Sequence, residues 1–213
     1  MLSSAPSPPP HEQPHSAQRH VAHILFELPE ADGYALASGA ALIVRQVVTR
    51  ETDDLDAFID ARAGSNSGTI DRLADAFAAE AARRGCGVQT VRRHPTFCRY
   101  LIDCDGQKLD IDLAVDAPAL EPWQRIDGLP VLTVLDLAAR KVLAIVDRLE
   151  ARDYTDLHAL ALIIGQQVSI DAALSLDAGL RTAHIAVRSF RATRNVHISQ
   201  LSAQRAMDVA LAA

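Results

Sequence analysis

The sequence lacks any apolar run of the roughly 20 residues that a membrane-spanning helix needs, so we expect no membrane partner. Its first 17 residues contain neither lysine nor arginine and no apolar segment, so they do not match a secretory signal. They are rich in proline, serine and histidine, and we predict a disordered tail there. Aromatic residues make up only 4% of the chain, whereas alanine is abundant, which favours helices that pack closely through small side chains.

Cysteines are also few. Cys86, Cys98 and Cys104 form neither an even disulfide set nor a closely spaced pair. We therefore expect reduced thiols in a cytoplasmic protein. A zinc cluster would need more cysteine or histidine at ligand spacing, so no zinc site is expected.

What the sequence does contain is an acidic strand behind a tight turn. Residues 34–58 predict a short apolar strand, a turn at Ser38 and Gly39, an apolar helix and a second strand. Asp54 and Asp56 on the second strand point to one face, because alternate side chains of a strand share a face. Two such carboxylates beside a helix N-terminus suit a magnesium–nucleotide site. The alternative interpretation is a solvated acidic loop.

A second pair of acids lies in a later hairpin. Two alternating runs flank the dipeptide Asp105-Gly106, which is a strong hairpin signal. Asp110 and Asp112 in the second run share one face, and this strand could lie beside the first acidic strand. Three converging carboxylates can hold two metal ions, but an edge strand with one wet face gives the same pattern. The pattern does not decide which of the two acids would be the third carboxylate.

Helices are predicted around these strands, within a length that suits one ample domain or a core with a helical extension. They are expected at residues 17–28, at 70–84 after the cap Thr69, from the cap Thr133 onward, from Arg152 to about Gly165, after the cap Ser169, and over about 181–213. The order of elements predicts an α+β protein with a small mixed sheet, helices on one side of it, and a helical C-terminal half. We expect a tail at 1–17, a core at 18–125 and a helical region at 126–213.

Three motifs over about residues 30 to 165 resemble a known family. They are Tyr34-Ala-Leu-Ala-Ser-Gly-Ala-Ala-Leu42, Arg50-x-Thr-x-Asp54-Leu-Asp56, and Asp136-Leu-Ala-Ala-Arg-Lys141 with Arg152-Asp-Tyr-x-Asp-Leu157. The turn followed by Asp-x-Asp resembles the DNA polymerase β superfamily of nucleotidyltransferases, and the finer wording is similar to the AbiEii/AbiGii toxin family. The resemblance implies a polymerase-β-like core.

The resemblance also implies an activity. Such an enzyme, from a toxin–antitoxin or phage-defence system, uses magnesium to move a nucleotidyl group from a nucleoside triphosphate to an acceptor hydroxyl, and pyrophosphate leaves. Several members of the family modify the 3′ end of tRNA, so the implied acceptor is RNA and the implied protein partner is an antitoxin.

Each implied role falls on a residue of this sequence. Ser38 and Gly39 would lie at the triphosphate. Asp54, Asp56 and Asp112 would bind magnesium, and Asp112 would also assist deprotonation of the acceptor. Lys141 would contact a phosphate, and Asp153 would lie near the nucleotide. Arg50 would serve either the triphosphate or an ion pair with Asp53. The plainer alternatives are a surface lysine for Lys141 and a helix-start ion pair between Arg152 and Asp153.

Two further questions stay open at this stage. The formal net charge of −6 argues against overall attraction to nucleic acid, yet residues 181–205 carry arginines and no acid. That segment, with Arg188, Arg191 and Arg194 as candidate RNA-binding residues, is interpreted as an RNA phosphate site, a solvated helix face or an antitoxin docking surface. The acceptor could instead be a small molecule or a protein hydroxyl. The altered turn at Ser38 and Ala40 also allows a nucleotide- or protein-binding module that has lost turnover.

Overall fold

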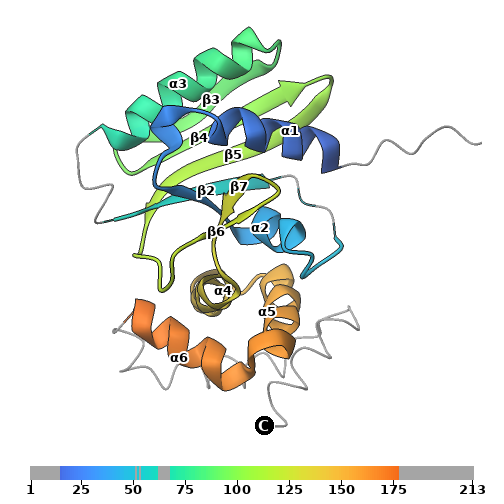
Figure 1. The fold of residues 1–213 in the computed structure, drawn as a ribbon, viewed down its shortest axis with the longest axis vertical. Helices are drawn as coiled ribbons and strands as arrows, with labels where there is room; N and C mark the ends of the chain where they lie inside the picture. Colours follow the sequence, from blue (N-terminus) through green and yellow to red (C-terminus); the bar gives the residue numbers. More distant parts are fainter. Residues whose placement is uncertain (1–14, 51, 53, 62–67, 178–213) are drawn as a thin grey trace, which may run out of the picture.

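A mixed seven-stranded sheet forms the centre of the computed structural model, which describes residues 15–50, 52, 54–61 and 68–177 (Figure 1). The strands are β1 (Tyr34–Ala37), β2 (Asp54–Asp60), β3 (Gly87–His94), β4 (Phe97–Cys104), β5 (Gln107–Asp116), β6 (Gln124–Ile126) and β7 (Leu129–Val131). Their spatial order is β3-β4-β5-β2-β1-β7-β6. β2 pairs with β5 and β1 with β7 in parallel, and the other neighbours are antiparallel.

Helices cover both faces of this sheet, so the expectation of helices on one side was wrong. α1 (His15–Phe26) and α3 (Thr69–Arg83) lie on one face, while α2 (Ser38–Val44), α4 (Val134–Arg148), α5 (Ala151–Ile164) and α6 (Gln166–Leu176) lie on the other (Figure 1). A short 3₁₀ helix, η1 (Pro29–Ala31), precedes β1. The reason is the central strand β1, whose four residues are all apolar and buried, so both of its faces need cover.

The acidic strands alternate as their sequence predicts. On β2, Leu55, Ala57 and Ile59 are buried, while the acids on the alternate positions face the other way. The buried side of the sheet packs on α3 through Tyr100, whose ring lies 6.0 Å from that of Phe77. The acids therefore point to the side of the sheet on which α4 and α5 lie.

The helical C-terminal half packs through small side chains, as the alanine content predicts. A second apolar cluster includes Ala139, Ala172 and Ala173 together with the larger Ile145 and Leu157. The predicted boundary between residues 125 and 126 falls within β6, and the sheet continues to the end of β7. The division into a core and a helical region stays a prediction.

The predicted hairpin and one of the three predicted helix caps are present in the structure. The hairpin at Asp105 and Gly106 is confirmed, with both residues at positive φ, and Thr133 does cap α4. Thr69 and Ser169 are not caps, because α3 begins at Thr69 itself and α6 begins at Gln166, after glycines with φ of +89° and +90°. The hydroxyl of Ser169 instead donates to the carbonyl of Gly165.

The expectation of three reduced thiols was also wrong. Cys86 and Cys104 form a disulfide, and Cys98 is free and buried. The antiparallel register of β3 and β4 places Gly87 opposite Asp103, which brings the two flanking cysteines together at a Cα separation of 4.4 Å. The sequence separation of 18 residues conceals this proximity.

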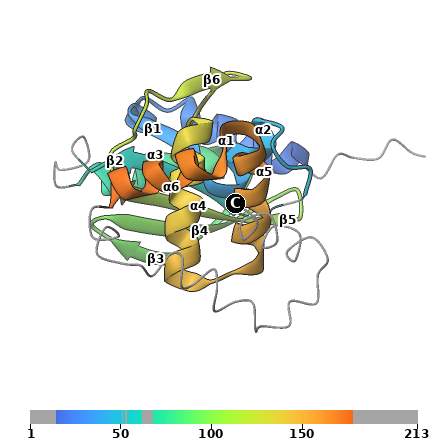
Figure 2. The same cartoon turned by 90° about the horizontal axis from the view of Figure 1, so that it is seen from below.

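Strand β3 ends the sheet on one side. It has an irregular register with β4 between Thr90 and Arg92, and nearly all of its residues are exposed. Figure 2, seen from the side of α4 to α6, shows β3 at the margin of the molecule. Its face on the α4 side is therefore open, and β4 lies between it and the acidic strand β5.

The described part of the chain has no single helix that is both long and apolar enough to cross a membrane. Helices α5 and α6 meet those requirements only when taken together, and the chain bends by 111° between them. Of the tail expected over residues 1–17, residues 1–14 lie outside the described residues. Residues 15–17 belong to α1, which begins at His15, so the tail prediction was wrong there.

We expect Thr133→Ala to destabilise the protein by about 0.5–2 kcal/mol, the usual cost of losing a helix cap. The Thr133 hydroxyl accepts from the amide of Asp136 at 3.2 Å and donates to its carboxylate at 3.0 Å. Urea unfolding measures the difference. Ser175→Ala removes an exposed hydroxyl within α6 and should change the free energy of unfolding by less than about 0.5 kcal/mol. Equal effects of the two substitutions would contradict the capping role.

Candidate functional site

The acids of β2 and β5 meet because the two strands are parallel neighbours in one register. Asp56 lies opposite Asp112, and Asp54 lies opposite Asp110. A cleft of about 300 Å³ opens over them and is lined by both Asp56 and Asp112, together with Ser38 from the turn. Neither Asp54 nor Asp110 lines this cleft. Lys141, Arg140 and Arg148 of α4 form the opposite wall.

The surroundings of Asp56 in this cleft disfavour the negative charge of its carboxylate. Burial, followed by the nearby charges of Asp54 and Asp112, raises the pKa of its carboxyl to about 7. A hydrogen bond from the Ser38 hydroxyl and the charge of Lys141 act in the opposite direction. The ionised form of Asp56 therefore needs a positive group close to it.

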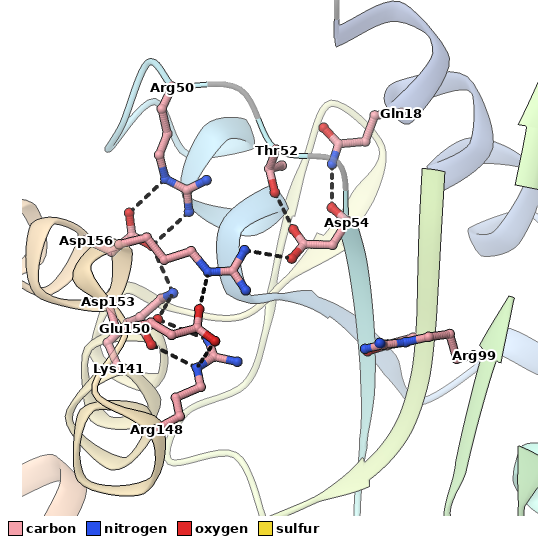
Figure 3. A network of polar contacts seen from close by, with 12 residues as sticks. Gln18, Arg50, Thr52, Asp54, Arg99, Lys141, Arg148, Glu150, Asp153 and Asp156 are labelled. Atoms are coloured by element: carbon pink, nitrogen blue, oxygen red, sulfur yellow. Dashed lines mark hydrogen bonds and ion pairs between the residues drawn. The ribbon is translucent and has the colours of Figure 1, made fainter. Parts of the chain in front are cut away.

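Asp54 is held by polar contacts on three sides. Its carboxylate accepts from the hydroxyl of Thr52 and, at 3.2 Å, from Arg152 at the start of α5. Its backbone carbonyl accepts from the Gln18 amide of α1 at 2.6 Å. Figure 3 shows the contacts of Asp54 with Thr52 and Gln18. Arg152 does not pair with Asp153; its second partner is Glu150, at 2.8 Å.

Asp112 is paired across the sheet. Arg99 lies directly opposite it on β4, and two nitrogens of the guanidinium donate hydrogen bonds to the carboxylate, one of them at 2.7 Å. The hydrogen bond and the opposite charge raise the pKa of Arg99, so this arginine stays protonated. Neither Arg99 nor its role was foreseen, although its position opposite an acid in a predicted hairpin was a usable signal.

The first turn of α2, which contains Ser38 and Gly39, has tight geometry. Ser38 has a φ of +52°, in the left-handed region where glycine is favoured. A Cβ on Gly39 would lie 3.0 Å from Nη2 of Arg50 and 3.2 Å from Oγ1 of Thr52. Gly39 therefore keeps a narrow space free between the turn and the Arg50 guanidinium.

A buried ion network lies behind the cleft (Figure 3). Lys141 is only 4% exposed, and its Nζ lies 2.9 Å from Asp153 and 2.8 Å from Asp156. Asp153 also accepts from Arg148 at 2.8 Å, and Asp156 accepts from Arg50 at 2.9 Å. The interpretation of Lys141 as a surface lysine was wrong, because its apolar neighbours reflected burial of the whole side chain.

Electrostatics in this network favour the ionised forms of Asp153 and Arg50. Burial alone would raise the pKa of Asp153, but hydrogen bonds from Arg148 and Lys141 hold it below its usual value. The hydrogen bond with Asp156 raises the pKa of Arg50. Asp156 and Arg148 were not among the predicted site residues. Their signal was helical spacing, since Asp156 follows Asp153 by three residues and Arg148 follows Lys141 by seven.

Not every predicted residue can be placed. Arg188, Arg191 and Arg194 lie outside the described residues, as does Asp53, one of the two partners expected for Arg50. The described residues contain no group of three Asp, Glu, His or Cys side chains already arranged to hold a metal ion. Instead, Asp54 and Asp112 each accept from an arginine.

Comparison with known proteins gives a family and a fold. A family model described as nucleotidyl transferase AbiEii toxin, Type IV TA system, matches residues 23–210. The structure is similar to that of JHP933 from Helicobacter pylori, with a TM-score of 0.57 and 19% identity over 94% of this chain and 90% of the other. It is also similar to the antibiotic-resistance factor ANT(2'')-Ia, with a TM-score of 0.51 and 15% identity over 81% of this chain and 96% of the other. A search of curated proteins finds no match.

The raised pKa of Asp56 predicts a pH-dependent gain in stability on its removal. The pKa is about 7 in the folded chain against an ordinary value of 3.8, so the stability that protonated Asp56 provides is complete below about pH 4 and is lost as the pH rises through about 7. In thermal unfolding with EDTA, Asp56→Asn should therefore raise the melting temperature more at pH 8 than at pH 5. Asp110→Asn, outside the cleft, is the control and should shift neither value. A lower melting temperature for Asp56→Asn at pH 8 would contradict this account.

Lys141→Met should have the opposite effect. It removes a buried ammonium and leaves Asp153 and Asp156 with one cation fewer. Breaking a buried ion pair costs about 3–5 kcal/mol, and we expect a value near the lower limit because Arg148 and Arg50 remain. Urea unfolding measures it, with the exposed Lys108→Met as a control that should change the free energy of unfolding by less than about 0.5 kcal/mol. A loss below about 1 kcal/mol would argue that Lys141 is dispensable to the fold.

Proposed function

The chain belongs to the AbiEii family of nucleotidyltransferase toxins, and we propose that this enzyme uses magnesium to transfer a nucleotidyl group from a nucleoside triphosphate to RNA, at the 3′ end of tRNA. The observation that carries the proposal is the parallel pairing of β2 with β5. It places Asp56 and Asp112 side by side in one cleft, next to the turn at Ser38. Phosphoryl-type transfer asks the protein mainly for positioning and neutralisation of charge, and this cleft offers both.

The donor set fits a divalent cation. Asp54, Asp56 and Asp112 supply carboxylate oxygens on one face of two adjacent strands, and mutual repulsion with burial raises the pKa of Asp56 to about 7. A cation there would relieve that repulsion. When bound, magnesium would offset charge on the triphosphate and lower the pKa of the acceptor hydroxyl. To reach this state Asp54 and Asp112 must exchange Arg152 and Arg99 for the metal.

The chain supplies its own groups for the triphosphate. The space that Gly39 keeps free is bordered by the Arg50 guanidinium, which suits a phosphate oxygen at the turn. Lys141 and Arg148 line the far wall of the cleft, where they add positive charge. Asp153 and Asp156 hold these cations in place through ion pairs rather than by touching the cleft themselves. We therefore assign Asp153 and Asp156 a positioning role.

The acceptor and the protein partner follow from the family. A toxin of this kind implies a cognate antitoxin and a nucleoside triphosphate substrate, and we propose both for this chain. The RNA acceptor is supported by the arginines of the C-terminal segment, Arg188, Arg191 and Arg194, which stay a sequence-based prediction. A small-molecule acceptor is the rival for the same cleft.

Transfer of label tests the proposal directly. The full-length protein is incubated with each α-labelled nucleoside triphosphate, magnesium and total tRNA, and the products are separated. We expect label in RNA, its loss with EDTA, and a decrease of at least about 100-fold for Asp56→Asn and Asp112→Asn, the usual cost of removing one electrostatic group from such a site. Gly39→Ala should raise the KM for the nucleotide, because the added methyl group crowds Arg50.

Asp110→Asn is the matched control for Asp112→Asn. Both acids lie on β5 and on one face, but Asp110 is outside the cleft, so its variant should keep wild-type activity. Equal losses in the two variants would reject the assignment of Asp112. Label found on a small molecule or a protein instead of RNA would reject the RNA acceptor, and wild-type activity of Asp56→Asn would reject the site.

A further inference from the structure

The outer hairpin of β3 and β4 presents two different faces. One face packs on α3, where Tyr100 donates to the carbonyl of Ala74 and Arg93 pairs with Asp71 and Asp75. The other face carries Arg92, Phe97 and Arg99, which we call the hairpin platform. Strand β3, which carries Arg92, lies at the margin of the molecule (Figure 2).

The hairpin platform is an aromatic ring flanked by two guanidinium groups. Cζ of Arg92 lies 5.6 Å from the centroid of the Phe97 ring, and Cζ of Arg99 lies 5.8 Å from it. Arg92 and Arg99 are also cross-strand partners, so both project from the same face as the ring. Both guanidinium groups lie over the ring. Guanidinium planes and aromatic rings are both surfaces on which a flat, electron-rich ring can stack.

The platform is continuous with the acidic cleft. Phe97 lies opposite Ala114 and Arg99 lies opposite Asp112, so one sheet face runs from the hairpin to the carboxylates. Phe97 lines the same cleft as Asp56 and Asp112, and Phe58 lines it from β2. A ring stacked on Phe97 would therefore lie next to the carboxylates.

Charge on the platform is available for an anion. Arg92 is exposed and makes no ion pair within the described residues, whereas the adjacent Arg93 pairs with two acids of α3. Arg99 forms its pair with Asp112, which the proposed metal would release. The protein has a formal net charge of −6. Arg92 nevertheless stays exposed and without an ion pair within the described residues, on the outer side of the acidic cleft.

We propose that the hairpin platform binds the end of a single RNA strand. One base stacks on Phe97 and a backbone phosphate contacts Arg92, which directs the terminal hydroxyl toward Asp112. Stacking on an aromatic side chain with a cation on the phosphate is how single strands are held without dependence on sequence. The inference rests on the proposed function, and it adds an acceptor contact on β3 and β4 to the one proposed for the C-terminal arginines.

Binding of RNA in the absence of any nucleoside triphosphate tests the platform. A fluorescent single-stranded RNA of about eight nucleotides is titrated with full-length protein, and anisotropy is followed at several salt concentrations. The variants are Phe97→Ala, Phe97→Trp and Arg92→Gln, with Arg93→Gln as a control that removes the same charge from the opposite face of the same strand. Calorimetric titration with magnesium and each nucleoside triphosphate is run on every variant.

We expect Phe97→Ala to weaken RNA binding by about 5- to 150-fold, the range for loss of one stacked base, and Phe97→Trp to retain it. Arg92→Gln should weaken binding and reduce the slope of log K against log salt by about 0.7, the value for one phosphate contact on a single strand. Arg93→Gln should bind RNA like the wild type. Nucleotide affinity should not change in Arg92→Gln or Arg93→Gln, because neither arginine lines the cleft.

The outcomes separate the platform from the proposed function. If Phe97→Ala binds RNA as tightly as the wild type, or if Arg92→Gln loses RNA and nucleotide affinity together, the platform is wrong. A wild-type protein that binds nucleotide and transfers label to a protein or a small molecule without binding RNA also overturns the platform, while nucleotidyl transfer stands. A wild-type protein that binds no nucleotide and transfers no label overturns the proposed function itself, whatever RNA it binds.

Discussion

Repulsion between the carboxylates of β2 and β5 is the constraint on which the rest of the structure depends. The parallel register fixes Asp56 beside Asp112, so neither strand can turn its charge away without moving its buried side chains as well. The nearest cations come from other parts of the chain: Arg99 from the hairpin, and Lys141 and Arg152 from the helices. The helical half therefore compensates the charge of the sheet as well as covering its apolar face.

The buried ion network behind the cleft explains why the cations near the acidic strands are held rigidly. Asp153 and Asp156 are fully buried and hold Lys141, Arg148 and Arg50 at fixed positions. Removing one member leaves a buried partner without its counter-ion, which is costly. The acids on the sheet are different, because they stay close to each other with a net cost to folding. A cluster that destabilises the chain but is retained in the fold is typical of a site kept for its chemistry.

Signals that act over a few residues were sufficient to predict much of this arrangement. The period-two alternation gave the acidic faces, the Asp-Gly dipeptide gave the hairpin between β4 and β5, and Thr133 gave the start of α4. Contacts that depend on three-dimensional neighbours could not be predicted in this way. The disulfide of Cys86 with Cys104 follows from strand register, and the contact of Arg50 with Asp156 joins residues 106 positions apart. The caps expected at Thr69 and Ser169 failed because left-handed glycines just before the helices set their starting points.

The position of β3 at the edge of the sheet affects how copies of the protein can associate in solution. An edge strand presents unpaired backbone groups on which a strand of another molecule can add. In β3 the irregular register at Thr90 and Arg92 bends the strand, and the basic residues from Arg92 to His94 charge its exposed end. A second copy that approached this edge would bring its own arginines against them. The charged side chains at the mouth of the cleft therefore also disfavour edge-to-edge extension of the sheet by a second copy.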